Sequence, residues 1–136
     1  MKNIFITGGS KGIGKELVKT FARLGHQVVF TYQYSAESAQ KIVDELHAEG
    51  FTNVYTFKCD MGNEAEVKAL FKGNKEILKD VDVLINNAGI RDSKLNANPK
   101  PFLMTSSAEW WEVMHNNVNG VMNTSRAVLP SMIKRK

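Results

Sequence analysis

Several kinds of site are excluded by what the chain lacks. Its single cysteine, Cys59, excludes an internal disulfide and a zinc site built on cysteine ligands. No apolar run approaches the roughly 20 residues that a membrane-spanning helix requires. No cationic and apolar leader opens the chain, because its first apolar run covers only residues 4–6. We therefore expect a cytoplasmic protein with no metal centre and no membrane partner.

Charge of one sign is not concentrated either. The net charge is +4 at pH 7, and the lysines and arginines are scattered along helical patterns except in the run at residues 134–136. No basic stripe carries the interleaved aromatic side chains of a nucleic-acid site, so we expect no nucleic-acid partner. The 136 residues, 43% of them hydrophobic and 24% charged, predict one globular domain.

The most informative stretch lies in the first fifteen residues. A strand pattern at residues 3–6 leads into the sequence TGGSKGIG at residues 7–14, and a helical pattern follows at once. A strand, a glycine-rich turn and a helix start together present backbone N–H groups to a phosphate. Gly8, Gly12 and Gly14 can supply the sharp turn, the close approach of a diphosphate and the close packing of helix on sheet. Their G-x-x-x-G-x-G spacing differs from the generic G-x-G-x-x-G motif.

Strand and helix patterns alternate along the rest of the chain. Further strands are predicted at residues 27–34, 53–60 and 81–85. The intervening helices are predicted to begin, weaken or end at Gly25, Ser35, Gly50, Asn63 with Glu66, and Gly73-Asn74. A polar loop at residues 90–105 precedes a helix at 107–129, which Ser106 and Glu109 cap and Pro130 bends or ends. Four β-α units in succession predict a doubly wound parallel α/β sheet.

Polar and small residues follow each predicted strand. In doubly wound sheets, ligands bind beyond the carboxyl ends of the strands, where the strand order reverses. The first strand ends in the glycine turn, the second in Gln33-Tyr34, the third in Asp60-Met61 and the fourth in residues 86–89, Asn-Asn-Ala-Gly. These four ends are the candidate site.

With Asn117 added, seven residues past Trp110, these motifs resemble the short-chain dehydrogenase/reductase family in content, order and spacing. Within that family the chain looks nearest to the 3-oxoacyl-acyl carrier protein reductase and acetoacetyl-CoA reductase type. The resemblance covers essentially the whole chain. It implies a Rossmann-type sheet of four strands in the order 3-2-1-4, with helices on both faces.

The resemblance also implies roles for individual residues. The diphosphate and the adenosine ribose would be held by the glycine turn, the adenine by the end of the third strand, and the second ribose by the end of the fourth. The residues concerned are Gly8, Ser10, Lys11, Gly12, Ile13 and Gly14, then Gln33, then Asp60 and Met61, then Asn86, Asn87, Ala88 and Gly89. Plainer roles stay open: Lys11 as a solvated cation, Asp60 as a turn or capping residue, and Asn86 to Gly89 as a simple turn.

The end of the second strand favours NADP over NAD. An acidic residue there would bind a free ribose 2′-hydroxyl and repel a 2′-phosphate. Gln33 and Tyr34 occupy that place, and Lys11 can reach the same ribose.

The family's catalytic residues are only partly present. By resemblance, Asn117 would interrupt a helix and hold a water in a proton relay, although a satisfied buried asparagine without that role stays open. The family's serine and its Tyr-x-x-x-Lys have no counterpart here, because Tyr32, Tyr34 and Tyr55 lie upstream and none has lysine at the fourth following position. We therefore expect residues 1–136 to be a single dinucleotide-binding domain, incomplete at its C-terminus and inactive or nearly so alone. The substrate would be a small molecule or an acyl thioester.

Three interpretations remain. The chain is the amino-terminal part of an NADP-dependent ketoreductase, or a cofactor-binding module without catalysis, or an unrelated fold of the response-regulator or flavodoxin type. The first strand disfavours the third interpretation, because this strand lacks the acidic pair of a phosphoreceiver. The strand at 81–85 would be a poor edge strand, and Trp110, Met114 or Val121 would be partly uncovered. We therefore expect self-association through this side, as a homo-oligomer, or completion by a separate chain.

Overall fold

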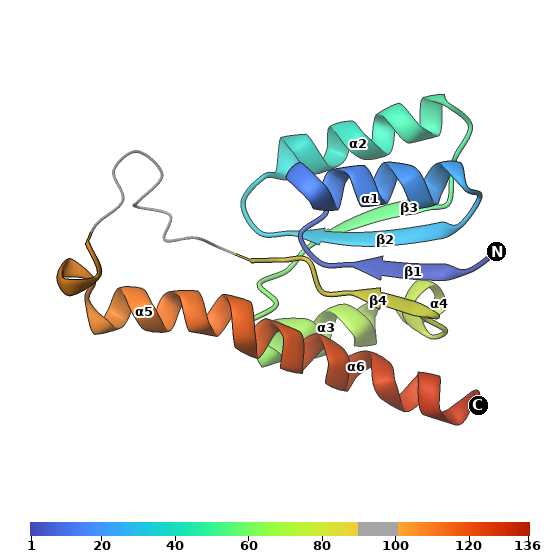
Figure 1. Ribbon diagram of the computed structural model, residues 1–136. Helices are drawn as coiled ribbons and strands as arrows, with labels where there is room; N and C mark the ends of the chain where they lie inside the picture. The colour runs from blue at the N-terminus through green and yellow to red at the C-terminus, as the bar shows by residue number, and fades with distance from the viewer. Residues whose placement is uncertain (90–100) are drawn as a thin grey trace.

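The computed structural model describes residues 1–89 and 101–136, and its core is a four-stranded parallel sheet (Figure 1). The strands are β1 (Asn3–Ile6), β2 (Gln27–Tyr32), β3 (Val54–Lys58) and β4 (Val83–Ile85). Their order is β3-β2-β1-β4, and all neighbours are parallel. The predicted fold class and strand order are both confirmed.

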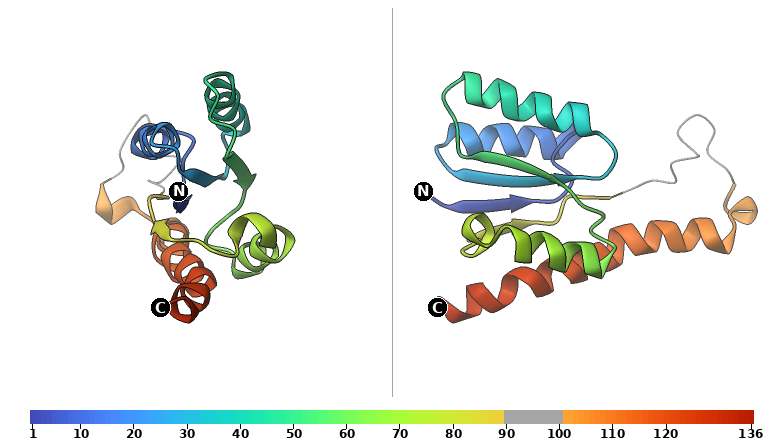
Figure 2. Two further views of the ribbon diagram at one scale, coloured as in Figure 1. Left: turned by 90° about the vertical axis from the view of Figure 1, so that its right-hand side faces the viewer. Right: turned by 180° about the vertical axis from the view of Figure 1, so that it is seen from behind.

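Helices cover both faces of this sheet (Figure 2). They are α1 (Gly12–Arg23), α2 (Ala36–Ala48), α3 (Glu64–Gly73), α4 (Lys75–Leu78), α5 (Ser107–Met114) and α6 (Gly120–Lys134), with a 3₁₀ turn η2 (Phe102–Met104) and a π-helical turn η3 (His115–Asn119). α1 and α2 lie over one face, whereas α3 and α6 lie over the other. α5 extends beyond the carboxyl ends of the strands.

The apolar side chains of the strands alternate between two cores. Ile6 and Phe30 pack toward α1 and α2, and Phe5 and Val29 pack toward α3 and α6. All four side chains are 0–1% exposed, because helices cover both faces. β1 is therefore a central strand, and the turn that follows it is held on both sides.

The predicted helix ends are largely confirmed. Gly25 and Gly50 have φ angles of +82° and +96°, so both adopt the left-handed conformation that ends a helix. The predicted weak point separates α3 from α4 at Asn74. Ser35 precedes α2 as predicted, but its hydroxyl makes no capping hydrogen bond, and β2 ends at Tyr32 instead of residue 34.

Two other predicted strands are also shorter than their sequence patterns. β3 covers Val54–Lys58 within the predicted 53–60, and β4 covers Val83–Ile85 within 81–85. Before β4, the amide of Asp82 already donates to the carbonyl of Asn3 at 2.8 Å, and its carboxylate accepts from the Asn3 amide at 2.8 Å. The side chain of Asp82 therefore holds this end of the strand pair.

The predicted helix at 107–129 is divided and also longer than expected. Ser106 and Glu109 form both bonds of a capping box at its start. The π-helical turn η3 then separates α5 from α6, and α6 continues through Pro130 to Lys134. Pro130 is exposed and removes only one intrahelical donor.

The last turn of α6 is held by tertiary contacts, and this explains why Pro130 does not end the helix. Ser131 donates through its hydroxyl to the carbonyl of Lys79 at 2.5 Å. Arg135 donates to the carboxylate of Asp82 at 2.9 Å and to the carbonyl of Val81 at 2.5 Å. These bonds connect the end of α6 to the segment that leads into β4.

The outer side of β4 and α6 is partly uncovered, as predicted. β4 is an edge strand, and the exposed fractions of Val83, Trp110 and Val121 are 37%, 50% and 41%, while Met114 is half-buried. Of the loop predicted at 90–105, residues 90–100 lie outside the described part. Within 1–89 and 101–136, no helix combines the length and apolarity needed to cross a bilayer, and no group of three metal-ligating side chains occurs.

Candidate functional site

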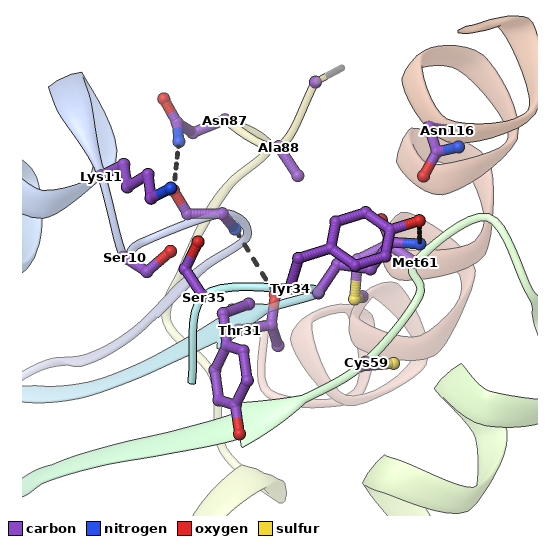
Figure 3. A pocket seen from close by; sticks show the side chains of 14 residues that line it. Ser10, Lys11, Thr31, Tyr34, Ser35, Cys59, Met61, Asn87, Ala88 and Asn116 are labelled. Atoms are coloured by element: carbon purple, nitrogen blue, oxygen red, sulfur yellow. Dashed lines mark hydrogen bonds between the residues drawn. The ribbon is translucent and has the colours of Figure 1, made fainter. Parts of the chain in front are cut away.

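A pocket of about 270 Å³ lies at the carboxyl ends of the strands (Figure 3). Its lining comes from the turn after β1, the ends of β2, β3 and β4, and η3. The lining residues are Gly8, Ser10, Lys11, Thr31, Tyr32, Gln33, Tyr34, Ser35, Cys59, Met61, Asn87, Ala88, Gly89 and Asn116. The structure thus brings together eight of the predicted site residues: Gly8, Ser10, Lys11, Gln33, Met61, Asn87, Ala88 and Gly89.

The glycine-rich turn fits closely against the end of β4. Gly8 has a φ of +69°, and a Cβ there would lie 2.8 Å from the Cα of Ala88. A Cβ on Gly14 would lie 2.2 Å from the carbonyl oxygen of Gly8. Gly12 differs, because its φ is +54° but a Cβ there would have no atom within 4 Å. Gly8 and Gly14 are therefore needed because neighbouring atoms leave no room for a side chain. Gly12 is needed for its backbone conformation.

A fourth glycine, Gly9, also shapes this turn, although the sequence pattern did not single it out. A Cβ on Gly9 would lie 2.6 Å from the Cβ of Phe30, so the turn lies directly on β2. Its amide donates to the carbonyl of Thr31 at 2.9 Å. Two adjacent glycines one residue after a strand are the sequence signal for this contact.

The side chain of Asn87 locks the turn to β4. Its Nδ2 donates to the carbonyl oxygens of Thr7 at 3.1 Å and Gly8 at 2.9 Å. The buried hydroxyl of Thr7 accepts in return from the amides of Asn87 at 3.1 Å and Ala88 at 3.0 Å. The ends of β1 and β4 therefore form one rigid unit, in which Thr7 is a residue that the sequence did not indicate.

The start of α1 leaves backbone donors available. Within residues 1–89 and 101–136, the amides of Lys11, Gly12 and Ile13 donate no hydrogen bond, and Lys11 precedes the helix without a side-chain cap. The first turn of α1 holds no acidic residue. Free amides at the positive end of a helix dipole are suited to an anionic phosphate. This end of the pocket therefore fits the diphosphate of a dinucleotide.

The rim at the end of β2 is polar and uncharged. Gln33 donates through Nε2 to the hydroxyl of Tyr34 at 3.2 Å, and Tyr34 is 78% exposed. Among the described residues that line the pocket, none is a carboxylate and Lys11 is the cation. Ser10, Lys11 and Ser35 lie near one another in Figure 3. This rim is compatible with a phosphorylated ribose.

The end of β3 forms the opposite side of the pocket. Met61 is 5% exposed and lines it, whereas Asp60 does not. The carboxylate of Asp60 accepts from the amide of Gly62 at 2.9 Å and lies 3.6 Å from Nε2 of His115. Asp60 therefore shapes its own turn, and its contact with the adenine stays a prediction.

Cys59 also lines this side, although no sequence pattern indicated a role for it in the site. Burial, with smaller contributions from Glu66 and Asp60, raises the pKa of its thiol to about 12. The thiol is therefore protonated near neutral pH and is a poor nucleophile.

The π-helical turn η3 brings two asparagines to the site. Asn116 lines the pocket and donates to the carbonyl of Glu112 at 3.0 Å. Asn117 lies beside Gly89, since a Cβ on that glycine would be 3.4 Å from its Oδ1. The helix is interrupted at Asn117, as expected, whereas Asn116 was not predicted as a site residue. The π-helical geometry depends on packing and leaves no local sequence signal.

Besides Asp60 and Asn117, four predicted residues do not line the pocket itself. Ile13 is 76% exposed and Asn86 is exposed, while Gly12 and Gly14 lie in the first turn of α1. Gly14 still acts on the site, because its missing Cβ lets the carbonyl of Gly8 and the side-chain amide of Asn87 approach.

Asn123 connects the end of β3 to α6. Its buried amide donates to the carbonyls of Met61 at 2.9 Å and Gly62 at 3.1 Å. Gly62 in turn has no room for a side chain, because a Cβ there would lie 2.5 Å from the ring of His115. α6, η3 and the Met61 side of the pocket are therefore directly connected.

Comparison with known proteins agrees with this architecture. The family model described as short chain dehydrogenase matches residues 2–136. A 3-oxoacyl-[acyl-carrier-protein] reductase, FabG, from Staphylococcus aureus is 32% identical over 99% of this chain and 52% of its own length. The human short-chain dehydrogenase/reductase 3 is 29% identical over 98% of this chain and 42% of its own length. The chain spans about half the length of the curated relatives it matches.

Solved structures of short-chain dehydrogenases share this fold. A short chain dehydrogenase from Burkholderia cenocepacia, crystallised in complex with NADP, superposes with a TM-score of 0.81 and 29% identity, over 95% of this chain and 50% of the other. Serine dehydrogenase from Escherichia coli gives a TM-score of 0.80 and 28% identity, over 97% and 56%. The sequence motifs, the strand order and the family match agree, and the chain belongs to the short-chain dehydrogenase family.

Proposed function

We propose that this chain binds NADP(H), in preference to NAD(H), as the dinucleotide-binding part of an oxidoreductase that reduces a carbonyl of a 3-oxoacyl-like substrate. The observation that carries the proposal is the set of free amides at residues 11–13 beside a turn that only glycine fits. The 32% identity to the Staphylococcus aureus reductase and the likeness to a structure in complex with NADP support the substrate class and the cofactor.

Each part of the pocket has a proposed partner in the cofactor. The amides of Lys11, Gly12 and Ile13 would bind the diphosphate, and Met61 would pack on the adenine. Ala88 and Gly89 would leave room for the ribose on the nicotinamide side, with Asn86 near it and Asn87 holding the turn. When bound, NADPH supplies the hydride that reduces a carbonyl carbon.

The chain's own contribution to proton transfer is Asn117, which we propose holds a water in the proton path. The 136 residues contain three tyrosines, none of them in a Tyr-x-x-x-Lys sequence. A general acid alone contributes about 10² to 10⁴-fold to such a reaction. We therefore propose that residues 1–136 form one dinucleotide-binding domain that binds the cofactor without measurable turnover.

A fluorescence titration with NADPH and with NADH, followed by an acetoacetyl-CoA reduction assay, tests this function. The expected result is saturable NADPH binding, weaker NADH binding and no turnover by this chain. The same assay separates a cofactor-binding module from a part of a ketoreductase. Added residues that carry a serine and a Tyr-x-x-x-Lys should restore turnover only if the chain is part of a ketoreductase. Turnover by the 136 residues themselves would refute the argument from the missing acid.

We also propose that two copies associate through the outer side of β4 and α6. The edge of β4 away from β1 is unpaired within residues 1–89 and 101–136, and Val121, Leu129 and Ile133 are 41–65% exposed along α6. Exposed apolar edges of this kind favour association. Light scattering on a size-exclusion column should give a dimer mass, and Val121→Glu with Leu129→Glu should give a monomer. A wild-type monomer would contradict this proposal.

A further inference from the structure

The π-helical turn η3 contacts the ends of two different strands. The ring of His115, its first residue, lies against the turn after β3, since a Cβ on Gly62 would be 2.5 Å from it. Asn116 comes next and lines the pocket. Asn117 then lies beside Gly89 at the end of β4. Three successive side chains of one short turn therefore face the end of β3, the pocket and the end of β4.

The imidazole of His115 also faces a carboxylate. Its Nε2 lies 3.6 Å from Oδ2 of Asp60, the residue predicted to bind the adenine. The other carboxylate oxygen, Oδ1, accepts from the amide of Gly62 at 2.9 Å. The separation of 3.6 Å suits an ion pair but is longer than a hydrogen bond, which a shift of about 0.5 Å would form. Oδ2 is therefore the oxygen left for a ligand, and His115 is a side chain that faces it.

The backbone of the turn after β3 is held by α6. Asn123 donates to the carbonyls of Met61 at 2.9 Å and Gly62 at 3.1 Å. A Cβ on Gly120 would lie 3.4 Å from the Cβ of Met61, so the start of α6 also packs on this turn. Because these contacts fix the backbone without His115, the contribution left to His115 is the direction of the Asp60 carboxylate.

The geometry allows the carboxylate to serve two donors at once. An ionised carboxylate oxygen has two lone pairs, so Oδ2 can accept from an imidazole N–H and from the amino group of an adenine. The side chains of His115 and Asp60 are 44% and 24% exposed, which leaves both accessible to a ligand. An adenine bound to Asp60 would therefore act on His115, and through it on the turn that carries Asn116 and Asn117.

We propose that His115 is a positioning residue, which orients the carboxylate of Asp60 toward the adenine and connects occupancy of the adenine end of the pocket to η3. The inference rests on the proposed function, because it assumes that the adenine of a dinucleotide lies at the end of β3. It concerns a side chain outside the motifs that the sequence pointed to.

Backbone amide chemical shifts of the isotope-labelled chain on addition of ADP test the proposal. ADP carries the adenine and the diphosphate that NAD and NADP share, and it has no nicotinamide. In the wild type, ADP should shift the amides of residues 11–13 and also those of η3. In His115→Ala, the shifts at residues 11–13 should remain and those at η3 should be lost, with ADP bound about three- to tenfold more weakly.

The conservative variant separates positioning from packing. His115→Gln should restore most of the η3 response and of the affinity, because the amide nitrogen of glutamine can stand where Nε2 stands. Asp60→Asn keeps an acceptor for the Gly62 amide but removes the carboxylate, so it should lose the η3 response as His115→Ala does. The double variant should lose no more affinity than the more affected single variant.

His26→Ala is the matched control. His26 is half-buried like His115, but it precedes β2 at the amino ends of the strands, away from the pocket (Figure 1). Its replacement should change neither the affinity for ADP nor the response of η3. Circular dichroism of each variant confirms that it is folded, and Asp60→Asn gives the same test if His115→Ala does not fold.

The outcomes separate this inference from the function on which it rests. Shifts at η3 that persist in His115→Ala, or that are missing from the wild type while residues 11–13 respond, would overturn the role of His115 and leave dinucleotide binding intact. A folded His115→Gln that behaves like His115→Ala would overturn it as well. A wild-type chain in which neither ADP nor NADPH shifts residues 11–13 would overturn the proposed function, and this inference with it.

Discussion

The side-chain amide of Asn87 donates to the main-chain oxygen of Gly8 at 2.9 Å, so a residue at the end of β4 fixes the turn at the end of β1. The two residues are separated by 79 positions in the chain. The same amide donates to the carbonyl of Thr7, whose hydroxyl accepts from the backbone amides of Asn87 and Ala88. The turn is therefore rigid before any ligand arrives, and preorganisation of this kind lowers the entropic cost of binding.

Replacing Asn87 by alanine should weaken both folding and binding. The carbonyls of Thr7 and Gly8 would lose a partly buried donor, which destabilises the fold by about 1–3 kcal/mol. A turn that is no longer fixed should bind NADPH about tenfold less tightly. Urea unfolding and NADPH fluorescence measure the two effects, and Asn53→Ala at an exposed position is the control. Unchanged affinity for NADPH would show that the hydrogen bonds of Asn87 do not organise the site.

Gly14→Ala tests the close approach inside the turn. The added Cβ would lie 2.2 Å from the carbonyl oxygen of Gly8 and 2.5 Å from Nδ2 of Asn87, so the turn must shift. Overpacking of this kind costs about 1–3 kcal/mol, and NADPH binding should be largely lost. Gly73→Ala, where no atom lies within 4 Å, should leave stability and binding unchanged or slightly improved. Wild-type binding by Gly14→Ala would contradict the described turn geometry.

Asn123→Leu tests the connection between α6 and the Met61 side of the pocket. Two buried carbonyls, those of Met61 and Gly62, would lose their donor, so the free energy of unfolding should fall by about 1–3 kcal/mol. Asn119→Leu at an exposed position should have little effect. Differential scanning calorimetry distinguishes the two variants. Equal melting temperatures would show that the Asn123 bonds contribute no net stability.

The ion pair between Arg135 and Asp82 should make the free energy of unfolding depend on pH. The amide of Asn3, and then the guanidinium of Arg135, hold the pKa of Asp82 below its ordinary value of 3.8. Because the folded pKa is the lower one, this contribution is fully present above pH 3.8 and is lost as the pH falls through the folded pKa.

Asp82→Asn should therefore unfold more easily than wild type by about 1 kcal/mol near neutral pH. The difference should shrink below about pH 4, where the wild-type carboxylate takes up a proton. Asp44→Asn, on the exposed side of α2, is the control. Urea unfolding across this pH range measures the difference. A stability difference that stays constant down to low pH would contradict the assigned role of the carboxylate.

The sheet and the glycine turn could be predicted from the sequence because their signals are local. Alternating strand and helix periods, Gly25 and Gly50 at helix ends, and the capping box of Ser106 are each set by a few neighbouring residues. The strand order followed from the resemblance that those motifs carried.

The remaining features depend on contacts between distant residues. The role of Thr7 depends on Ala88, that of Gly9 on Phe30, and that of Asn123 on Met61. Pro130 was expected to bend or end the helix, but the bonds of Ser131 and Arg135 hold the helix beyond it. Local propensity was overridden in that case by tertiary contacts.

The most direct test of the central claim is the change in backbone amide chemical shifts of the isotope-labelled chain when NADPH is added. If the amides after β1 bind the diphosphate, the largest changes will fall at Lys11, Gly12 and Ile13, with smaller ones at Gln33, Met61 and Asn87. Binding of NADPH that leaves the amides of residues 11–13 unperturbed, or no binding at all, would contradict the account.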